Sequence, residues 1–222
     1  MQPSLVRFTE EIKMPACKAA IPYKRAHRWV TAKETKAPPP VVQVFVTQKA
    51  YARFCLHAGS DMENEVGGWL VGKWCRDEAT QEQYVVVEGI LPAVYTRQGS
   101  TFLTFTSHSQ LMMLDLMEQY YPDKDLVGWY HTHPGMSIFL SGYDTWLHEN
   151  FFPEHWQVAL VIEPHSTTGG FFIRDTRGNL DPRLYYGFHE LKDGSERTVV
   201  HWHNMNKKEE LSSLPAKEEQ ES

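Results

Sequence analysis

The stretch "GWYHTHPGMSIFLSGYDTW", residues 128–146, places two histidines one residue apart and an aspartate a short distance downstream. On an extended strand, side chains two residues apart point to the same face, so His131 and His133 present both imidazoles to one point. Pro134 cannot continue a central strand and the glycine after it permits a turn, so the chain is expected to leave the sheet there. A loop across "MSIFL" then brings Asp144, near the start of a helix, back to the histidines.

These three side chains have the composition of a metal site. Two imidazole nitrogens and one carboxylate oxygen leave the fourth tetrahedral position for water, which is typical of a catalytic zinc site. The sequence therefore predicts one zinc ion held by His131, His133 and Asp144. Less specific interpretations stay open, because an isolated His-x-His pattern is a weak signal and Ser141 with Asp144 also fits a helix capping box. His148 is nearby in sequence, and a surface or helix-terminal role is expected for it.

A catalytic zinc site also needs a general base to carry the proton from water to the leaving group. Glu65 opens the segment "EVGGWLVG", residues 65–72, at the start of an expected strand whose glycines allow another backbone to come close. Asp61 and Glu63 pass the same test. Position and chemistry alone therefore leave three candidates, with Glu65 the best of them.

The surrounding sequence alternates strand and helix patterns. Apolar runs and period-two patterns predict strands, and apolar residues at helical spacing predict helices that end at Gly-Ser-Asp or at Pro122. The resulting order β-α-β-β-α-β-α-β-β indicates an α/β domain around one curved sheet. The expected strands are 41–50, 65–77, 83–94, 125–134, 156–164 and 169–180, and the expected helices are 48–62, 107–121 and 141–152.

The ends of the chain differ from the middle. Residues 1–40 carry eight Lys/Arg against three acidic residues and end in "APPP", so they are predicted to form a basic, proline-containing arm before a domain at 41–190. Residues 191–222 are predicted to be an extension with a charged, disordered tail. The 41–203 segment carries eleven Lys/Arg against twenty acidic residues, which disfavours nucleic acid as a partner.

Three cysteines and no long apolar run complete the composition. Cys17, Cys55 and Cys75 form no metal-like pair and cannot all be bridged to one another, so a secreted disulfide scaffold is not indicated and a cytoplasmic protein is expected. The N-terminus lacks a continuous apolar segment, and no later stretch approaches the length of a membrane span. We therefore expect no membrane partner.

The segments "EVGGWLVG" and "HTHPGMSIFLSGYD", residues 131–144, together resemble the JAMM (MPN+) metalloprotease signature. The motif identity covers these two segments, and the order of elements extends the resemblance over 41–190. In that family two histidines and an aspartate hold zinc, a glutamate is the general base, and a serine helps to stabilise the tetrahedral intermediate. The resemblance assigns these roles to His131, His133, Asp144, Glu65 and Ser141.

The family also implies a fold and an activity. The expected fold is a single MPN/JAB-like domain of the α/β (α+β) class, with a curved mixed β-sheet flanked by helices in a cytidine-deaminase-like three-layer arrangement. The expected activity is isopeptide hydrolysis that removes a ubiquitin-like protein in one metal-assisted step, without a covalent intermediate. No long insertion follows Asp144, so selectivity for lysine-63 linkages is not expected.

The resemblance further suggests a substrate clamp and partners. Members often hold the extended C-terminal tail of the modifier with the segment that corresponds here to residues 95–106, although a plain connecting loop is an equally good interpretation. The compact domain is similar to bacterial JAMM proteins, some of which accompany E1- and E2-like enzymes in antiphage systems. The expected substrate-binding residues are Thr96, Arg97, Gln98, Gly99, Ser100, Thr101 and Phe102.

Two alternatives to a deubiquitinase-like isopeptidase stay open. The same chemistry can release an amino acid or short extension from a sulfur-carrier protein, as in some small bacterial JAMM proteins. A non-catalytic MPN scaffold is the other, but scaffolds of this family lack the metal set that is intact here.

Overall fold

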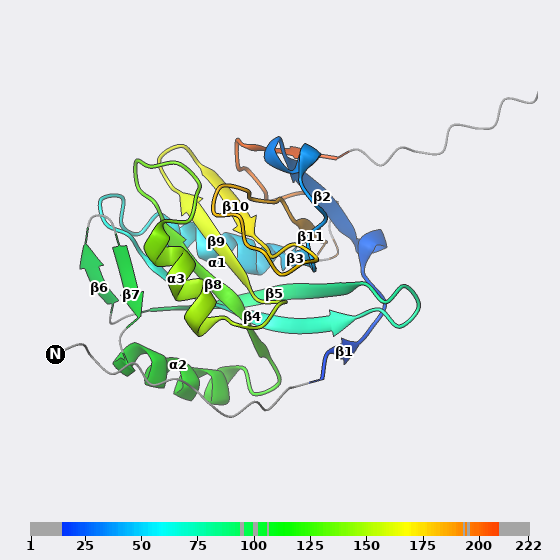
Figure 1. Ribbon diagram of the computed structural model, residues 1–222, viewed down its shortest axis with the longest axis horizontal. Helices are drawn as coiled ribbons and strands as arrows, with labels where there is room; N and C mark the ends of the chain where they lie inside the picture. Colours follow the sequence, from blue (N-terminus) through cyan, green and yellow to red (C-terminus); the bar gives the residue numbers. More distant parts are fainter. Residues whose placement is uncertain are drawn as a thin grey trace, which may run out of the picture.

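The computed structural model describes residues 15–93, 96–99, 102–105, 107–192, 194 and 196–208 (Figure 1). The predicted succession of strands and helices is present, with a strand pair before the second helix and further strands toward both chain ends. In chain order the elements are β1 (Cys17–Lys18), η1 (Tyr23–Arg25), β2 (Ala26–Thr31), η2 (Lys33–Lys36), β3 (Gln43–Thr47), α1 (Gln48–Ala58), β4 (Gly67–Arg76), β5 (Gln83–Pro92), β6 (Thr96–Gly99), β7 (Phe102–Phe105), α2 (Ser107–Tyr120), β8 (Asp125–Thr132), α3 (Gly142–Phe151), β9 (Val158–Glu163), β10 (Thr168–Phe172), β11 (His189–Leu191) and β12 (Met205–Lys207).

The described residues form a ten-stranded mixed sheet and a separate hairpin. The strand order in the sheet is β10-β9-β8-β4-β5-β3-β11-β2-β12, with β1 beside β4. The β8–β9, β3–β5, β3–β11 and β1–β4 pairs are parallel, and the other pairs are antiparallel. Strands β6 and β7 pair only with each other. This mixed sheet confirms the predicted fold class.

Helices cover both faces of the sheet, which gives the expected three layers. Neighbouring residues of one strand point to opposite faces, and on β8 Tyr130 packs in the cluster that contains α1, whereas Trp129 packs in the cluster that contains α2 and α3. On β9, Leu160 and Val161 divide in the same way. Figure 1 shows α1 behind the strands and α3 in front of them. The face under α2 and α3 is the one that carries the histidines.

The sheet extends to both sides of the predicted 41–190 domain. Strand β2 lies before the expected start at Val41 and pairs with both β11 and β12. The buried carboxylate of Glu190 holds this edge together, because it accepts hydrogen bonds from Trp29 Nε1, Gln48 Nε2 and Thr198 Oγ1. The described residues between 191 and 208 are therefore folded at this edge, and the predicted disordered tail falls largely at 209–222, outside the described residues.

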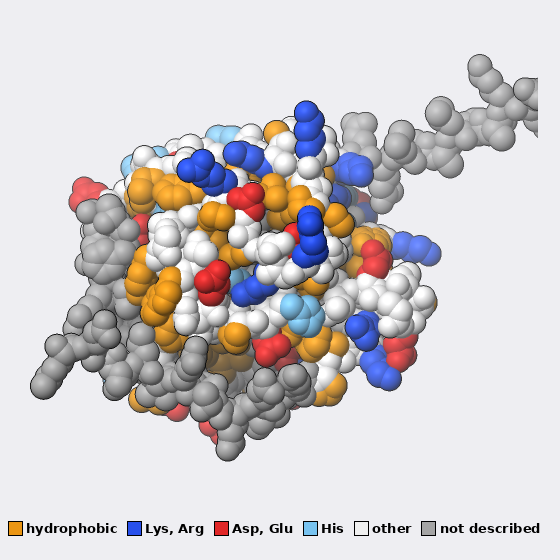
Figure 2. Space-filling view, in the orientation of Figure 1, with side chains coloured by type: hydrophobic (Ala, Val, Ile, Leu, Met, Phe, Trp, Pro, Cys, Tyr) orange, Lys and Arg blue, Asp and Glu red, His pale blue; other side chains and the backbone are white. Residues whose placement is uncertain are grey.

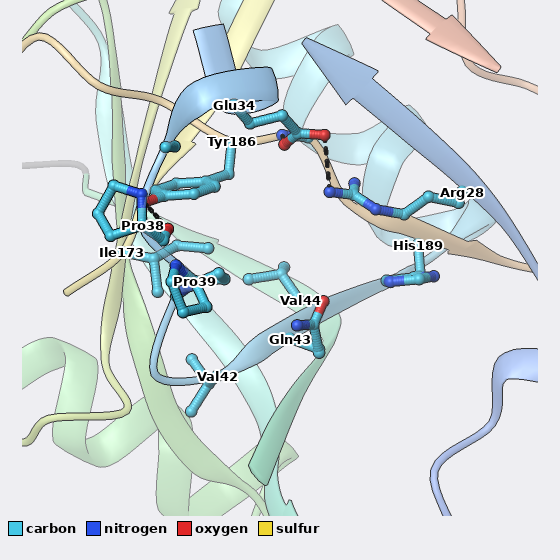
Figure 3. Close-up of a pocket in the computed structure, with 13 residues that line it drawn as sticks. Arg28, Glu34, Pro38, Pro39, Val42, Gln43, Val44, Ile173, Tyr186 and His189 are labelled. Atoms are coloured by element: carbon cyan, nitrogen blue, oxygen red, sulfur yellow. Dashed lines mark hydrogen bonds and ion pairs between the residues drawn. The ribbon is translucent and has the colours of Figure 1, made fainter. Parts of the chain in front are cut away.

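The N-terminal segment also closes a cavity of about 190 Å³ against the sheet (Figure 3). An Arg28–Glu34 ion pair of 2.8 Å lies on one side, and the Tyr186 hydroxyl donates to the Pro38 carbonyl on the other. The Glu34 carboxylate also accepts from Gly187 N. Earlier in the predicted arm, Ala19 N donates to the Arg76 carbonyl and Ile21 N to the Asp77 carboxylate, so specific polar contacts bind the arm to the domain along its described length.

None of the helices in the described part of the chain combines the length and the apolar character needed to cross a bilayer.

A disulfide joins the start of the described chain to β4. Strand β1 lies parallel to the end of β4, with Cys17 opposite Cys75, and these two side chains are bridged. Cys55 has a free thiol. Cysteine spacing could not predict this bridge, because the two residues are 58 positions apart and meet only through the β1–β4 pairing.

Replacing Cys17 by serine is expected to lower the free energy of unfolding by up to about 4 kcal/mol, because the unfolded chain regains the freedom of a 58-residue loop. Urea unfolding followed by tryptophan fluorescence measures this difference. A reducing agent should lower the unfolding midpoint of the unchanged protein and leave that of Cys17→Ser unchanged. Equal effects of the reductant on both proteins would argue against the bridge.

Candidate metal centre

His131 is fixed by strand pairing on both of its sides. Within β8 it lies opposite Gly67 of β4 and Val161 of β9. Its ring is fully buried and stacks on Trp129, with ring centroids 4.7 Å apart and planes 8° apart. The next residue, Thr132, accepts a hydrogen bond from Val66 N and donates its own backbone N–H to the Val66 carbonyl. These bonds hold the start of β4 beside the histidine.

His133 lies where the chain leaves the sheet. Its backbone N–H still donates to the Ile162 carbonyl, and Gly135 then turns the chain with φ +71°, as the His-Pro-Gly sequence predicts. The Glu163 carboxylate fixes the turn by accepting from Gly135 N at 2.9 Å. His133 Nδ1 lies 3.2 Å from the Ser137 carbonyl oxygen, which can only accept a hydrogen bond. The proton is therefore placed on Nδ1, and the lone pair of Nε2 faces the centre of the site.

Asp144 is delivered by the first turn of α3. Ser141 is the N-cap: its hydroxyl accepts from Asp144 N at 3.1 Å, and the Asp144 carboxylate accepts from Ser141 N at 2.7 Å. The capping box that the Ser-x-x-Asp spacing suggested is thus present. It does not exclude the metal interpretation, because the same carboxylate also faces both histidines.

The three predicted ligands converge. The Nε2 atoms of His131 and His133 are 2.9 Å apart, and they lie 3.5 and 3.7 Å from the two carboxylate oxygens of Asp144. All three side chains are buried. Burial would raise the pKa of Asp144, but the nearby imidazoles and Ser141 outweigh it and hold that pKa far below its usual range. Burial lowers the pKa of His131.

This geometry and donor set fit a zinc ion. Ligand atoms about 2.0–2.1 Å from one ion at tetrahedral angles lie about 3.3 Å from one another, and the measured separations of 2.9–3.7 Å bracket that value. The neutral form of His133 directs a lone pair inward, and Asp144 is held ionised. One of its carboxylate oxygens and two imidazole nitrogens can therefore coordinate one divalent cation.

Glu65 is the candidate base that the structure brings to the site. It is 2% exposed and interacts electrostatically with His133 and Asp144, and its Oε2 atom has no hydrogen-bond partner among the described residues. Burial raises the pKa of Glu65 to about 7, against an opposing effect of His133. Asp61 instead accepts from the backbone of a local turn, and Glu63 is exposed. Of the three acidic candidates, only Glu65 is buried.

The glycine-rich start of β4 permits the close approach that the sequence predicts. A Cβ atom at Gly68 would overlap the carbonyl oxygen of Leu91 on β5. The strand can therefore lie tightly between β5 and β8 directly after Glu65.

The expected substrate-binding segment forms the β6–β7 hairpin rather than a plain loop. Thr96 to Gly99 pair with Phe102 to Phe105 in antiparallel register. Ser100 and Thr101 lie outside the described residues, so the clamp role predicted for residues 96–102 stays a prediction.

Two functional candidates around the cluster were not found from the sequence. His148 is not on the surface but fully buried in the last turn of α3, where its Nδ1 accepts from Trp129 Nε1 at 3.1 Å. Burial lowers the pKa of His148 to about 3. Glu163 anchors the turn after His133. Both contacts join residues that are distant in sequence, and no local motif marks them.

Comparisons with known proteins identify the family. The sequence profile of the family described as JAB1/Mov34/MPN/PAD-1 ubiquitin protease matches residues 39–153, more than half of the chain. The chain belongs to this family. The predicted JAMM (MPN+) membership is therefore confirmed.

Two curated relatives extend the match. The chain is 28% identical to the 26S proteasome non-ATPase regulatory subunit 14 of Drosophila melanogaster over 156 residues, which is 67% of this chain and 49% of the relative. It is 27% identical over 150 residues to the ubiquitin carboxyl-terminal hydrolase RPN11 of Saccharomyces cerevisiae, covering 63% of this chain and 47% of that one. This JAB-family chain thus spans about half the length of these relatives.

The fold also matches a solved structure. A protein from Desulfitobacterium hafniense, known from its solution structure, superposes with a TM-score of 0.51 at 20% identity, covering 72% of this chain and all of that chain. The likeness supports the fold alone.

Removing one ligand should abolish tight zinc binding. We expect His131→Ala and Asp144→Asn to weaken zinc affinity by more than about 100-fold, since even the loss of an outer-shell contact costs about 10–100-fold. Titration against a chromophoric chelator measures the affinity, and elemental analysis should find one zinc per unchanged chain. The exposed His155, which contacts Gln83, offers a matched control: His155→Ala should retain full zinc. Unchanged affinity in Asp144→Asn would remove Asp144 from the site.

Proposed function

We propose that this JAB-family protein is a zinc-dependent isopeptidase that cleaves the bond after the C-terminus of a ubiquitin-like modifier. The observation that carries the proposal is the convergence of His131, His133 and Asp144 beside the buried carboxylate of Glu65. The names of the relatives, which include a ubiquitin hydrolase, support the choice of substrate. The intact ligand set favours a hydrolase over a non-catalytic scaffold.

His131, His133 and Asp144 would hold the zinc ion, which supplies Lewis-acid activation of water and of the scissile carbonyl when bound. The partner-free Oε2 of Glu65 is free to accept the proton that the attacking water loses. Glu65 then returns this proton to the departing amine, so the bond is broken in one step. None of the three cysteines is needed as a nucleophile.

Ser141 would stabilise the oxyanion. A serine hydroxyl has two lone pairs and one hydrogen, and the bond from Asp144 N uses only a lone pair. That bond therefore does not compete with donation of the hydroxyl hydrogen to a developing negative charge. Because it is the N-cap of α3, Ser141 has a fixed position relative to the metal ligand Asp144.

Glu65→Gln is expected to keep zinc and to lower kcat by about 10²- to 10⁴-fold, because the amide cannot accept a proton. The measurement is hydrolysis of a fluorogenic ubiquitin substrate by protein whose zinc content has been determined. Glu63→Gln, an exposed neighbour with the same change of charge, is the matched control and should retain full activity. A fully active, zinc-loaded Glu65→Gln protein would exclude Glu65 as the base.

The β6–β7 hairpin supports a clamp for an extended peptide. Within the described residues its two strands pair only with each other, so each has an outer edge whose backbone groups can bond an added strand. Such pairing needs no large side chains and suits a tail that ends in glycines.

Deletion of residues 97–101 should therefore raise KM for a ubiquitin-based substrate by about 10-fold or more, since main-chain hydrogen bonds of about 1 kcal/mol each are lost. Zinc content and the thermal midpoint show whether the shortened protein keeps its fold. If a folded, zinc-loaded deletion variant had unchanged kcat and KM, the hairpin would not be the clamp.

The biological setting stays a prediction. E1- and E2-like partners, an antiphage system and the cytoplasm rest on the sequence resemblance and composition. Affinity capture with the Glu65→Gln protein, followed by mass spectrometry of the retained conjugate, identifies the modifier and its target.

A further inference from the structure

A cleft opens directly beside Ser141. It is lined by residues 137–142, the loop between the histidines and α3, and by η2 and Pro182–Arg183 from distant parts of the chain, and it has a volume of about 550 Å³. The Leu140 N–H donates to the Pro182 carbonyl at 2.8 Å, which ties the two opposite walls together. The cleft is therefore a built feature that adjoins the catalytic loop.

Two cationic side chains line this cleft. Lys33 comes from η2 and Arg183 from the turn after Pro182, and both side chains are exposed. The Lys33 ammonium lies 5.9 Å from the centre of the Tyr185 ring, a contact that helps to hold it in place. In the described part of the chain, neither cation has a carboxylate within 4.0 Å. Glu34, which follows Lys33, pairs instead with Arg28, and Asp181 accepts a hydrogen bond from the backbone N–H of Arg183 with Oδ1.

The cleft lies where the basic N-terminal segment meets the acidic part of the chain. Lys33 belongs to residues 1–40, which carry eight Lys/Arg against three acidic residues, whereas Arg183 belongs to residues 41–203, which carry eleven Lys/Arg against twenty acidic residues. Figure 2 shows Lys and Arg side chains gathered along the upper edge of the molecule, where Figure 1 draws η2. The remaining walls include Ile138, Phe139 and Leu140. The carboxylate of an acidic side chain complements the two cations of this cleft.

The cleft lies away from the proposed clamp for the modifier. Figure 1 shows the β6–β7 hairpin at the left edge and η2 at the top, and elements separated in one view are separated in space. None of the residues given above for the cleft walls belongs to the hairpin. If the hairpin holds the modifier tail, the cleft faces the other product of cleavage, which is the protein that carries the acceptor amine.

We propose that the Lys33–Arg183 cleft binds an acidic side chain next to the acceptor lysine of the conjugated protein, and so selects targets by their local sequence. This inference rests on the isopeptidase activity proposed above. It assigns target choice to residues that neither bind the metal nor transfer the proton.

The test uses two ubiquitin conjugates, each joined through an isopeptide bond to the lysine of a short peptide. One peptide has glutamates on both sides of the lysine, and the other has glutamines. The unchanged protein should show about fivefold higher kcat/KM for the acidic conjugate, as expected for two solvent-accessible ion pairs. In Lys33→Gln/Arg183→Gln the ratio should fall to about one, mainly through KM.

The matched control is Lys36→Gln/Arg177→Gln. Lys36 belongs to η2, and Arg177 is an exposed arginine that pairs with Asp175 outside the cleft. This variant loses the same charge as the cleft variant and should keep the fivefold preference. Equal cleavage of both conjugates by the unchanged protein would overturn the proposal. So would a preference that appears only after residues 209–222 are removed, since their glutamates would then be the occupants.

A third substrate separates this inference from the proposed function. Ubiquitin with a small fluorogenic amide lacks a target peptide, so its cleavage reports the activity alone. Loss of this cleavage in the cleft variant, to the same extent as for the conjugates, would assign the cleft to the modifier and overturn the proposal.

If the unchanged protein cleaves none of these substrates, the isopeptidase proposal fails for ubiquitin. Fluorescence anisotropy of the two free labelled peptides then tests whether the cleft binds an acidic side chain. Weaker binding of the acidic peptide to the cleft variant than to the unchanged protein, with no change for the glutamine peptide, supports the proposal. Equal binding of both peptides to both proteins overturns it.

Discussion

The site depends on the hydrogen bonding of β8 along both of its edges. His131 lies opposite Gly67 on one neighbouring strand and opposite Val161 on the other. Its position along the strand and the face to which its side chain points are therefore fixed by both pairings. A shift of one residue in either pairing would turn the imidazole to the opposite face, under α1. The same register brings Val66 to Thr132 and therefore places Glu65 beside the histidines.

A second constraint links the metal cluster to the start of α3. A buried carboxylate is costly unless it is paired and hydrogen-bonded. Asp144 meets this requirement through the Ser141 backbone and through two imidazoles, and each of these partners is itself fixed by the sheet or by the helix. Helix capping and ligand placement are consequently one arrangement, which explains why a Ser-x-x-Asp pattern can be read in both ways.

Much of the domain could be predicted from the sequence because its signals are local. Apolar periodicity located the strands and helices from β3 to β10 except the β6–β7 pair, and the spacing of His131, His133 and Asp144 located the cluster. Position and chemistry did not separate Glu65 from Asp61 and Glu63, since burial depends on the pairing of β4; only the family resemblance pointed to Glu65 in the sequence. The β2–β11–β12 edge was not predicted because its strands are short, and it is held by Glu190, whose side-chain partners come from three separate segments. The Cys17–Cys75 bridge and the roles of Glu163 and His148 likewise depend on contacts distant in sequence.

The positions of Lys33 and Arg183 relative to the family match have an evolutionary consequence. The match covers residues 39–153, which contain every proposed metal ligand and the proposed base, whereas these two cations come from before and after it. If the cleft selects targets as proposed, mutations in the flanking segments would change which conjugates are recognised without altering the proposed metal ligands or the proposed base. New targets would then arise through changes outside the segment that the family profile matches.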